Sequence, residues 1–231
     1  MNRASGLHHL ALSTADMKAQ IAFFSDVLGM ELVALYWMHG AEKTVHGFLR
    51  LNDRSSIAFV QNEAIAAAPR RLGVSHAGHA GGVSAGGTMQ HLALRVDTPD
   101  ELLAMRDRIR SRGVNVFGPI DHGMCQSIYL AGPEDLALEI STSAGPIDAA
   151  AWIDPEVVAY LGIDAAAELP AYRQPADYVR PAEAVPQPDP DPAKPHLRIP
   201  EKAYRRILAM DDAAYTARMS ETEPPVPAAR R

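Results

Sequence analysis

The chain has 231 residues, of which 47% are hydrophobic, and its formal net charge is −6 with histidine neutral. This composition is sufficient for a buried core in one large domain or two small ones. The acidic balance and the lack of basic clusters argue against nucleic acid or an anionic membrane surface as a partner. Cys125 is the only cysteine, which excludes an intrachain disulfide. With no signal peptide or membrane span expected either, we predict a cytoplasmic protein.

The first predicted module covers residues 7–61 and reads as a strand, a helix and three further strands. The opening strand is "LHHLALST". The helix starts near Asp16, places apolar side chains at helical spacing on one face, and ends at Gly29. The three following strands are expected at 31–38, 44–51 and 56–61.

Residues 62–88 form a linker rich in glycine, alanine and histidine, and residues 89–142 repeat the first module. The repeat is visible in "QHLAL" at residues 90–94, which matches "HHLAL" at residues 8–12. Thr98, Pro99 and Glu101 supply an N-cap, a first helical residue and a capping box. The strands of this second module are expected at 89–96, 114–118, 125–131 and 136–141.

Residues 143–231 are rich in proline and cannot form a core alone. Two interpretations stay open for this segment. It is either disordered or an extended arm that wraps over the body of the protein or over a partner chain. The second interpretation predicts a homo-oligomer that associates through the arm.

Strand alternation places one ionisable side chain on the polar face of each of three strands. These side chains are His9 in the first strand, His91 in its repeat, and Glu139 in the last strand. A sheet curled over these faces would gather all three. Two imidazoles and one carboxylate form a facial triad for a divalent metal, with positions left open for a substrate. Iron(II) is expected if the chemistry uses dioxygen, and manganese(II) or zinc(II) would also bind.

The repeated βαβββ pattern with "HHLAL", "QHLAL" and "LALEI" resembles the vicinal oxygen chelate superfamily. This superfamily contains glyoxalase I, the fosfomycin and bleomycin resistance proteins, and the type I extradiol dioxygenases. The resemblance covers residues 7–142 and implies an α+β fold of two tandem modules that form a cupped mixed sheet around one metal. It also implies that His9, His91 and Glu139 occupy three of the four possible ligand positions.

The fourth ligand position distinguishes the branches of this superfamily. Glyoxalase-like members carry a glutamate there, whereas Ala58 occupies the position here, because it follows Phe48 by ten residues as Glu139 follows Tyr129. The remaining ligand set is similar to that of extradiol dioxygenases, and Tyr129 matches their active-site tyrosine. Those enzymes usually have a histidine after an "NDR"-like stretch, where this chain has Ser55 and Ser56.

We therefore expect an iron(II) ring-cleaving dioxygenase that acts with dioxygen on a catechol-like aromatic. Tyr129 would bind the substrate, and His46 or His122 would transfer protons in place of the missing histidine. The first alternative is a redox-neutral, glyoxalase-like isomerase or lyase that uses a divalent metal. The second alternative is a metal-free, resistance-type protein that only binds its ligand.

Overall fold

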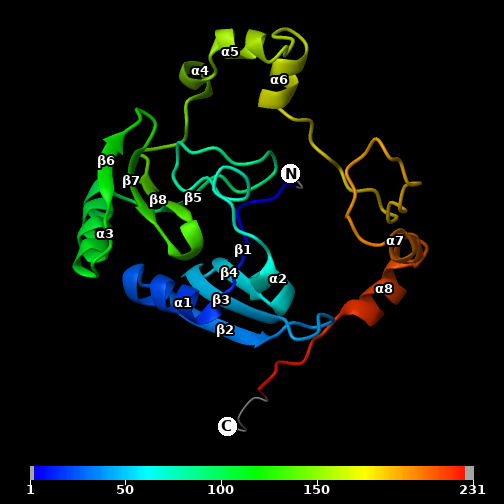
Figure 1. Cartoon of the computed structure of the whole chain (residues 1–231). Helices are drawn as coiled ribbons and strands as arrows, with labels where there is room; N and C mark the ends of the chain where they lie inside the picture. Colours follow the sequence, from blue (N-terminus) through cyan, green and yellow to red (C-terminus); the bar gives the residue numbers. More distant parts are fainter. Residues whose placement is uncertain (1–2, 227–231) are drawn as a thin grey trace. The chain divides into compact units, whose positions relative to one another are not determined.

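The computed structural model describes residues 3–226, which contain two four-stranded sheets (Figure 1). The first sheet has the order β1-β4-β3-β2 and the second has the order β5-β8-β7-β6. In each sheet the first and last strands of the module pair in parallel, and the remaining pairs are antiparallel. The strands of the first sheet are β1 (His9–Ser13), β2 (Glu31–Trp37), β3 (Val45–Asn52) and β4 (Ser55–Gln61). Those of the second are β5 (Leu92–Arg95), β6 (Phe117–Asp121), β7 (Gln126–Ala131) and β8 (Ala137–Thr142). The prediction of tandem βαβββ modules is confirmed.

The helices of the two modules begin and end where the sequence signals lie. In the first module α1 (Met17–Ala22) is capped by Asp16 and continues into the π-helical turn η1 (Phe23–Val27). Gly29 follows with a φ of +81°, a conformation that glycine adopts without steric cost. In the second module Thr98 and Glu101 form the expected capping box at the start of α3 (Pro99–Ser111).

The two modules share one hydrophobic core, which lies between the helix-covered backs of their sheets. Phe24, Phe59 and Leu49 of the first module are fully buried, as are Ile109 and Ile128 of the second, and all five belong to one cluster. Because both backs face this common core, the opposite faces of the two sheets point outward. We call these outward faces the front faces.

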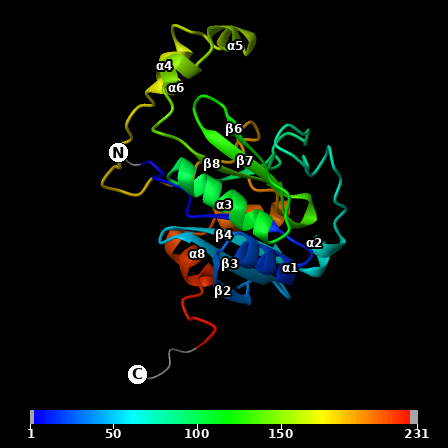
Figure 2. The same ribbon diagram turned by 90° about the vertical axis from the view of Figure 1, so that its left-hand side faces the viewer.

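Polar contacts also join the modules. A 3-10 turn, η2 (Pro133–Asp135), carries Glu134, whose carboxylate accepts hydrogen bonds from three groups around the start of α1. In addition, Arg108 of α3 donates to the carbonyl oxygens of Asp26 and Val27 at 2.8 and 2.9 Å. Figure 2 shows α3 running alongside the first module.

Three elements differ from the sequence prediction. The strand expected at 114–118 is observed as β6 (Phe117–Asp121), because Val116 packs into the core before pairing with β7 begins at Phe117. The strand expected from residue 89 pairs only from Leu92 onward. The segment 62–88 contains the short helix α2 (Glu63–Ala67), which Asn62 caps.

The residues after the second module divide between two compact units. Residues 5–175 form one unit, and residues 176–226 form another together with residues 3–4. The first unit includes α4 (Ala149–Trp152), α5 (Pro155–Tyr160) and α6 (Glu168–Arg173). The second includes α7 (Glu201–Leu208) and α8 (Asp212–Met219). Residues 227–231 of the predicted arm lie outside the described residues. Among the helices of residues 3–226, none has the length and apolarity needed to cross a membrane.

Candidate metal and ligand site

The front face of the second sheet carries a buried carboxylate in contact with an imidazole. Glu139 on β8 is only 6% exposed, and its Oε2 lies 2.8 Å from Nε2 of His91. The Ser141 hydroxyl donates to Oε1 at 2.6 Å and itself lies 2.8 Å from the hydroxyl of Ser127. Burial raises the pKa of Glu139, but the hydroxyls of Ser127 and Ser141 and the nearby His91 outweigh it, so the net pKa is lowered. The group is therefore an anion at neutral pH.

Two of the three predicted catalytic residues meet beside this carboxylate. Tyr129 on β7 is the cross-strand partner of Glu139, which places both side chains on the front face. Nε2 of His122, on the turn between β6 and β7, lies 2.8 Å from the Tyr129 hydroxyl. Burial and the negative charge of Glu139 raise the pKa of Tyr129 above its ordinary value. The phenol thus keeps its proton across the neutral range.

The front face of the first sheet carries a cluster of rings around the other predicted residues. His9 on β1 and His46 on β3 both contact the ring of Phe48, with centroids 5.4 and 4.4 Å apart. Tyr36 on β2 lies opposite His46, and its hydroxyl is 3.3 Å from Nδ1 of that histidine. Burial, together with the proximity of His9, lowers the pKa of His46. Within the described part of the chain, the buried Nε2 of His46 has no hydrogen-bond partner.

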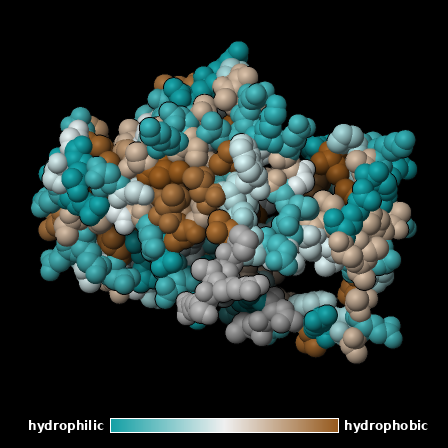
Figure 3. All heavy atoms as spheres, turned by 90° about the horizontal axis from the view of Figure 1, so that it is seen from below, coloured by the Kyte–Doolittle hydropathy of each residue, from teal (hydrophilic) through white to brown (hydrophobic). Residues whose placement is uncertain are grey.

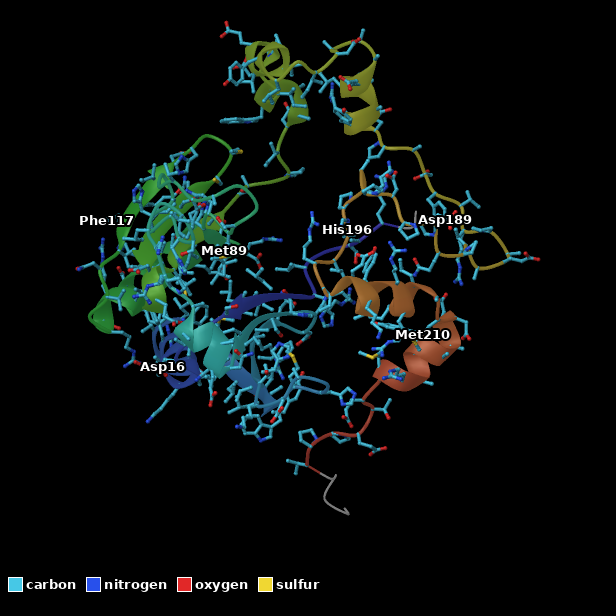
Figure 4. All side chains as sticks on the ribbon, turned by 45° about the vertical axis from the view of Figure 1, so that its right-hand side comes forward. Asp16, Met89, Phe117, Asp189, His196 and Met210 are labelled. Carbon is cyan, nitrogen blue, oxygen red and sulfur yellow. The ribbon has the colours of Figure 1, made fainter. Side chains whose placement is uncertain are left out.

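Some residues of the front faces were not predicted from the sequence. Tyr36 belongs to the ring cluster because it pairs with His46 across β2 and β3. Finding it from the sequence would have required the register between these two strands. Phe117 is 74% exposed and pairs with Tyr129, so it adds an open aromatic side chain to the front face of the second sheet (Figure 4).

The strand registers establish which positions of the two modules are equivalent. Ala58 on β4 pairs with Phe48 and with Ala11, as Glu139 pairs with Tyr129 and with Ala93. The predicted equivalence of Ala58 and Glu139 is therefore confirmed. Ala58 is fully buried and has no atom that could bind a metal.

A single chain does not bring the three predicted metal ligands together. His9 lies on the first sheet, with its Nδ1 2.8 Å from Nδ1 of His8, whereas His91 and Glu139 are in contact on the second. Across residues 3–226 no group of three or more His, Cys, Asp or Glu side chains is arranged to hold a metal. The expectation that a curled sheet would gather all three within one chain is not met, because the two sheets pack back to back.

The surroundings of the site offer room for a small molecule. A cavity of about 680 Å³ lies beside Ala93, Arg95 and Ser141. Arg95 forms an ion pair with Asp97 at 2.8 Å, and both side chains are largely exposed. Away from the site, Figure 3 shows hydrophobic side chains gathered around β2; Leu35 and Trp37 of this strand lie on the face opposite Tyr36 and are 51% and 70% exposed.

A duplicated βαβββ module with ionisable groups on its front faces is the architecture of the vicinal oxygen chelate class. The chain belongs to the Glyoxalase/Bleomycin resistance protein/Dioxygenase superfamily, whose family model matches residues 6–140. This match covers more than half of the 231 residues. Comparison with curated proteins gave no match.

Several solved structures are similar to this chain. A glyoxylase/bleomycin resistance protein/dioxygenase domain from Frankia sp. EAN1pec is 14% identical, with 61% of this chain and 99% of that chain covered and a TM-score of 0.49. TnmS3, an antibiotic binding protein from Streptomyces sp. CB03234, is 16% identical, with 61% and 98% covered and a TM-score of 0.44. The E126Q mutant of the fosfomycin resistance protein FosX from Listeria monocytogenes, complexed with Mn(II) and 1S,2S-dihydroxypropylphosphonic acid, is 18% identical. In that comparison 63% of this chain and 96% of that chain are covered, with a TM-score of 0.43.

Proposed function

We propose that the protein is a divalent-metal enzyme that acts on a small molecule with two adjacent oxygen atoms. The observation that carries this proposal is the contact between Glu139 and His91. Glu139 stays ionised despite its burial, because the hydroxyls of Ser127 and Ser141 and the nearby His91 lower its pKa. Its neighbours form a donor set that a metal such as iron, manganese or zinc accepts.

The third ligand in this proposal is His9 of a second copy of the chain. The front faces of the two sheets point outward, so a second molecule can lay its first sheet over the second sheet of this one. A two-fold symmetric dimer would form two such sites, each with His9 from one subunit and His91 and Glu139 from the other. The exposed Phe117 supplies apolar surface at that interface.

The bound metal would bind and polarise both oxygens of the substrate. The remaining roles belong to side chains of this protein. Tyr129, held by its contact with His122, would donate a hydrogen bond to a substrate oxygen. His46, whose lowered pKa keeps it neutral, would be the proton acceptor on the first sheet.

Among the reactions open to such a site, we favour iron(II)-dependent cleavage of a catechol-like ring by dioxygen. Ala58 in place of a fourth ligand supports this choice, since it leaves a position open for a further small ligand. The redox-neutral alternative is an isomerase or lyase reaction on an enediol-like substrate. The specific observation in its favour is that Ser55 and Ser56 replace the histidine expected of a ring-cleaving enzyme.

Elemental analysis followed by oxygen uptake tests the proposal. Protein purified without oxygen is expected to hold about one iron per chain and to consume dioxygen with at least one member of a catechol panel. The His9→Ala variant is the control and should lose both metal and uptake. Stoichiometric zinc, nickel or manganese without uptake would shift the assignment to redox-neutral chemistry. Absence of any bound metal, even after loading, would overturn the proposal in favour of a ligand-binding protein.

A further inference from the structure

We propose that Gln90 is a positioning residue that fixes the orientation of His91 and presents its Nε2 as the ligand atom. This inference rests on the proposed function, because it concerns how a predicted metal ligand is held. It starts from the repeated pentapeptides, in which the residue directly before each ligand histidine touches the Nδ1 atom of that histidine.

The side-chain amide of Gln90 can adopt only one orientation at this place. Its Nε2 faces three backbone carbonyl oxygens of the glycine-rich segment, at 3.4 Å to His79, 2.7 Å to Ala80 and 3.0 Å to Gly82. An amide oxygen cannot face three carbonyl oxygens, since all four groups are acceptors. The NH₂ group must therefore lie on the side of the segment, and Oε1 must lie on the side of His91.

This orientation determines where the proton of His91 resides. Oε1 of Gln90 contacts Nδ1 of His91, and an amide oxygen is only an acceptor, so Nδ1 must carry the hydrogen. Nε2 is then the nitrogen left for a metal, which would replace the proton that Nε2 shares with the carboxylate of Glu139. Nε2 is the atom that faces the Glu139 carboxylate, where the proposed metal would bind.

The first module holds its histidine in a similar way. Nδ1 of His8 lies 2.8 Å from Nδ1 of His9, and the two rings meet edge to face at 5.1 Å. If His9 donates this bond, its Nε2 is likewise free to bind a metal. The repeat therefore extends from the predicted ligands to the residues that orient them. Such outer contacts commonly affect metal affinity by about 10–100-fold.

Gln90 also connects the site to the segment between the modules. Through its three carbonyl contacts, the glycine-rich segment is fastened next to His91 rather than left to cross the surface freely. This gives "HAGHAGG" at residues 76–82 a physical role that does not require its histidines to bind metal.

The test compares Gln90→Leu with Gln90→Glu in the full-length protein. The first variant removes the acceptor for Nδ1. The second keeps that acceptor but replaces the NH₂ group with an oxygen that the three carbonyl oxygens repel, so the segment must move away from it. The readouts are the Nδ1–H resonance of His91 in metal-free protein, by nitrogen-15 imidazole NMR, and the affinity for zinc. Gln61→Leu is the matched control, because Gln61 is a half-buried glutamine that accepts a backbone hydrogen bond from Met17 on the back of the first sheet.

We expect Gln90→Leu to lose the Nδ1–H resonance and to bind zinc about 10–100-fold more weakly. Gln90→Glu should keep the resonance and bind zinc within about threefold of wild type, as should the control. A wild-type protein without the resonance, or equal zinc affinity in wild type and Gln90→Leu, would overturn the inference. If wild type binds no zinc, the proposed function fails, and the resonance alone then decides whether Gln90 positions His91.

Discussion

At the residue scale, the second sheet concentrates the chemistry around Glu139. His91 and the Ser141 hydroxyl satisfy the buried carboxylate, and Tyr129 lies directly across the strand pair. The sequence predicted His91 and Glu139 from strand alternation and Tyr129 from the resemblance to extradiol dioxygenases, whereas the contact with Ser141 was not predicted. It could not predict that His122 would contact Tyr129, since that depends on the course of the turn between β6 and β7.

The contact between His122 and Tyr129 leads to a prediction about catalysis. Tyr129→Phe removes the hydroxyl that would bind the substrate oxygen but leaves every proposed metal ligand in place. We expect kcat to fall by about 100-fold or more, with metal content unchanged. Steady-state kinetics with the most rapidly consumed substrate, combined with elemental analysis, measures both quantities. The control is Tyr160→Phe, because Tyr160 is 87% exposed and outside the site. Loss of metal from Tyr129→Phe, or an unchanged kcat, would contradict the role assigned to Tyr129.

At the element scale, the ends of helices were predicted well from local sequence signals, whereas the positions of paired strands were predicted less well. The capping box of α3 and the stop at Gly29 depend on neighbouring residues, so they can be read from a short stretch of sequence. The strand expected at 114–118 is observed further along the chain, because Val116 packs into the core before the strand begins. Val116 is apolar because it is buried there, and not because it lies in a paired strand. Periodicity alone does not separate these two causes.

The attachment of η2 to α1 is an element-scale feature that connects residues about half the chain apart. Glu134 accepts hydrogen bonds from the Thr14 hydroxyl at 2.5 Å, the Ala15 amide at 2.8 Å and the Gln20 side chain at 2.8 Å. Its φ of +58° is uncommon for a residue other than glycine. No local pattern predicts this contact, because both partners are ordinary polar residues in their own segments.

The free energy of unfolding should therefore depend on Glu134. We expect Glu134→Gln to lower it by about 1–3 kcal/mol, because the neutral amide replaces an acceptor oxygen with a donor group that faces other donors. Denaturant titration at pH 7 measures the change. Asp135→Asn is the neighbouring control, with the same left-handed backbone and a half-exposed ion pair to Arg70. That variant should change the free energy by less than about 1 kcal/mol. Equal effects of the two substitutions would contradict a specific role for Glu134.

The same contact predicts how stability changes with pH. Burial raises the pKa of Glu134, but hydrogen bonds from Thr14, Ala15 and Gln20 and the charge of Arg70 outweigh it, so the folded-state pKa is lowered. A carboxyl with a lowered folded-state pKa contributes stability above its unfolded pKa of about 4.3. This contribution declines as the pH falls toward the folded-state pKa. As the pH is lowered from 5, the melting temperature should therefore fall less in Glu134→Gln than in wild type. Thermal melting at a series of pH values measures this difference. An identical pH dependence in both proteins would exclude this carboxylate as a cause.

At the scale of the whole molecule, duplication and back-to-back packing together decide where a site can form. The repeat in the sequence predicted two modules and the matching positions of Ala58 and Glu139, which the strand registers confirm. It did not predict how the modules pack. Each module has an apolar back and a polar front, and this pattern is compatible with fronts that face one another within a chain or with fronts that face outward. The contacts that favour the outward arrangement, such as that of Glu134, join distant segments and leave no periodic pattern.

The outward arrangement predicts that metal binding can be restored by mixing two inactive variants. His9→Ala removes the proposed ligand of the first sheet, and Glu139→Gln removes one of the second, so each variant alone should bind no metal. In a mixed dimer one site combines both defects, whereas the other combines an intact His9 with an intact His91 and Glu139. Co-expression with different affinity tags allows the mixed dimer to be isolated. Random pairing should restore roughly a quarter of the wild-type metal sites in the unfractionated mixture.

Mixing His91→Ala with Glu139→Gln is the matched control, because both defects lie on the same sheet and every site of that dimer keeps one. Recovery in the first mixture but not in the second would support a site built by two subunits, whereas an isolated mixed dimer without metal would contradict it.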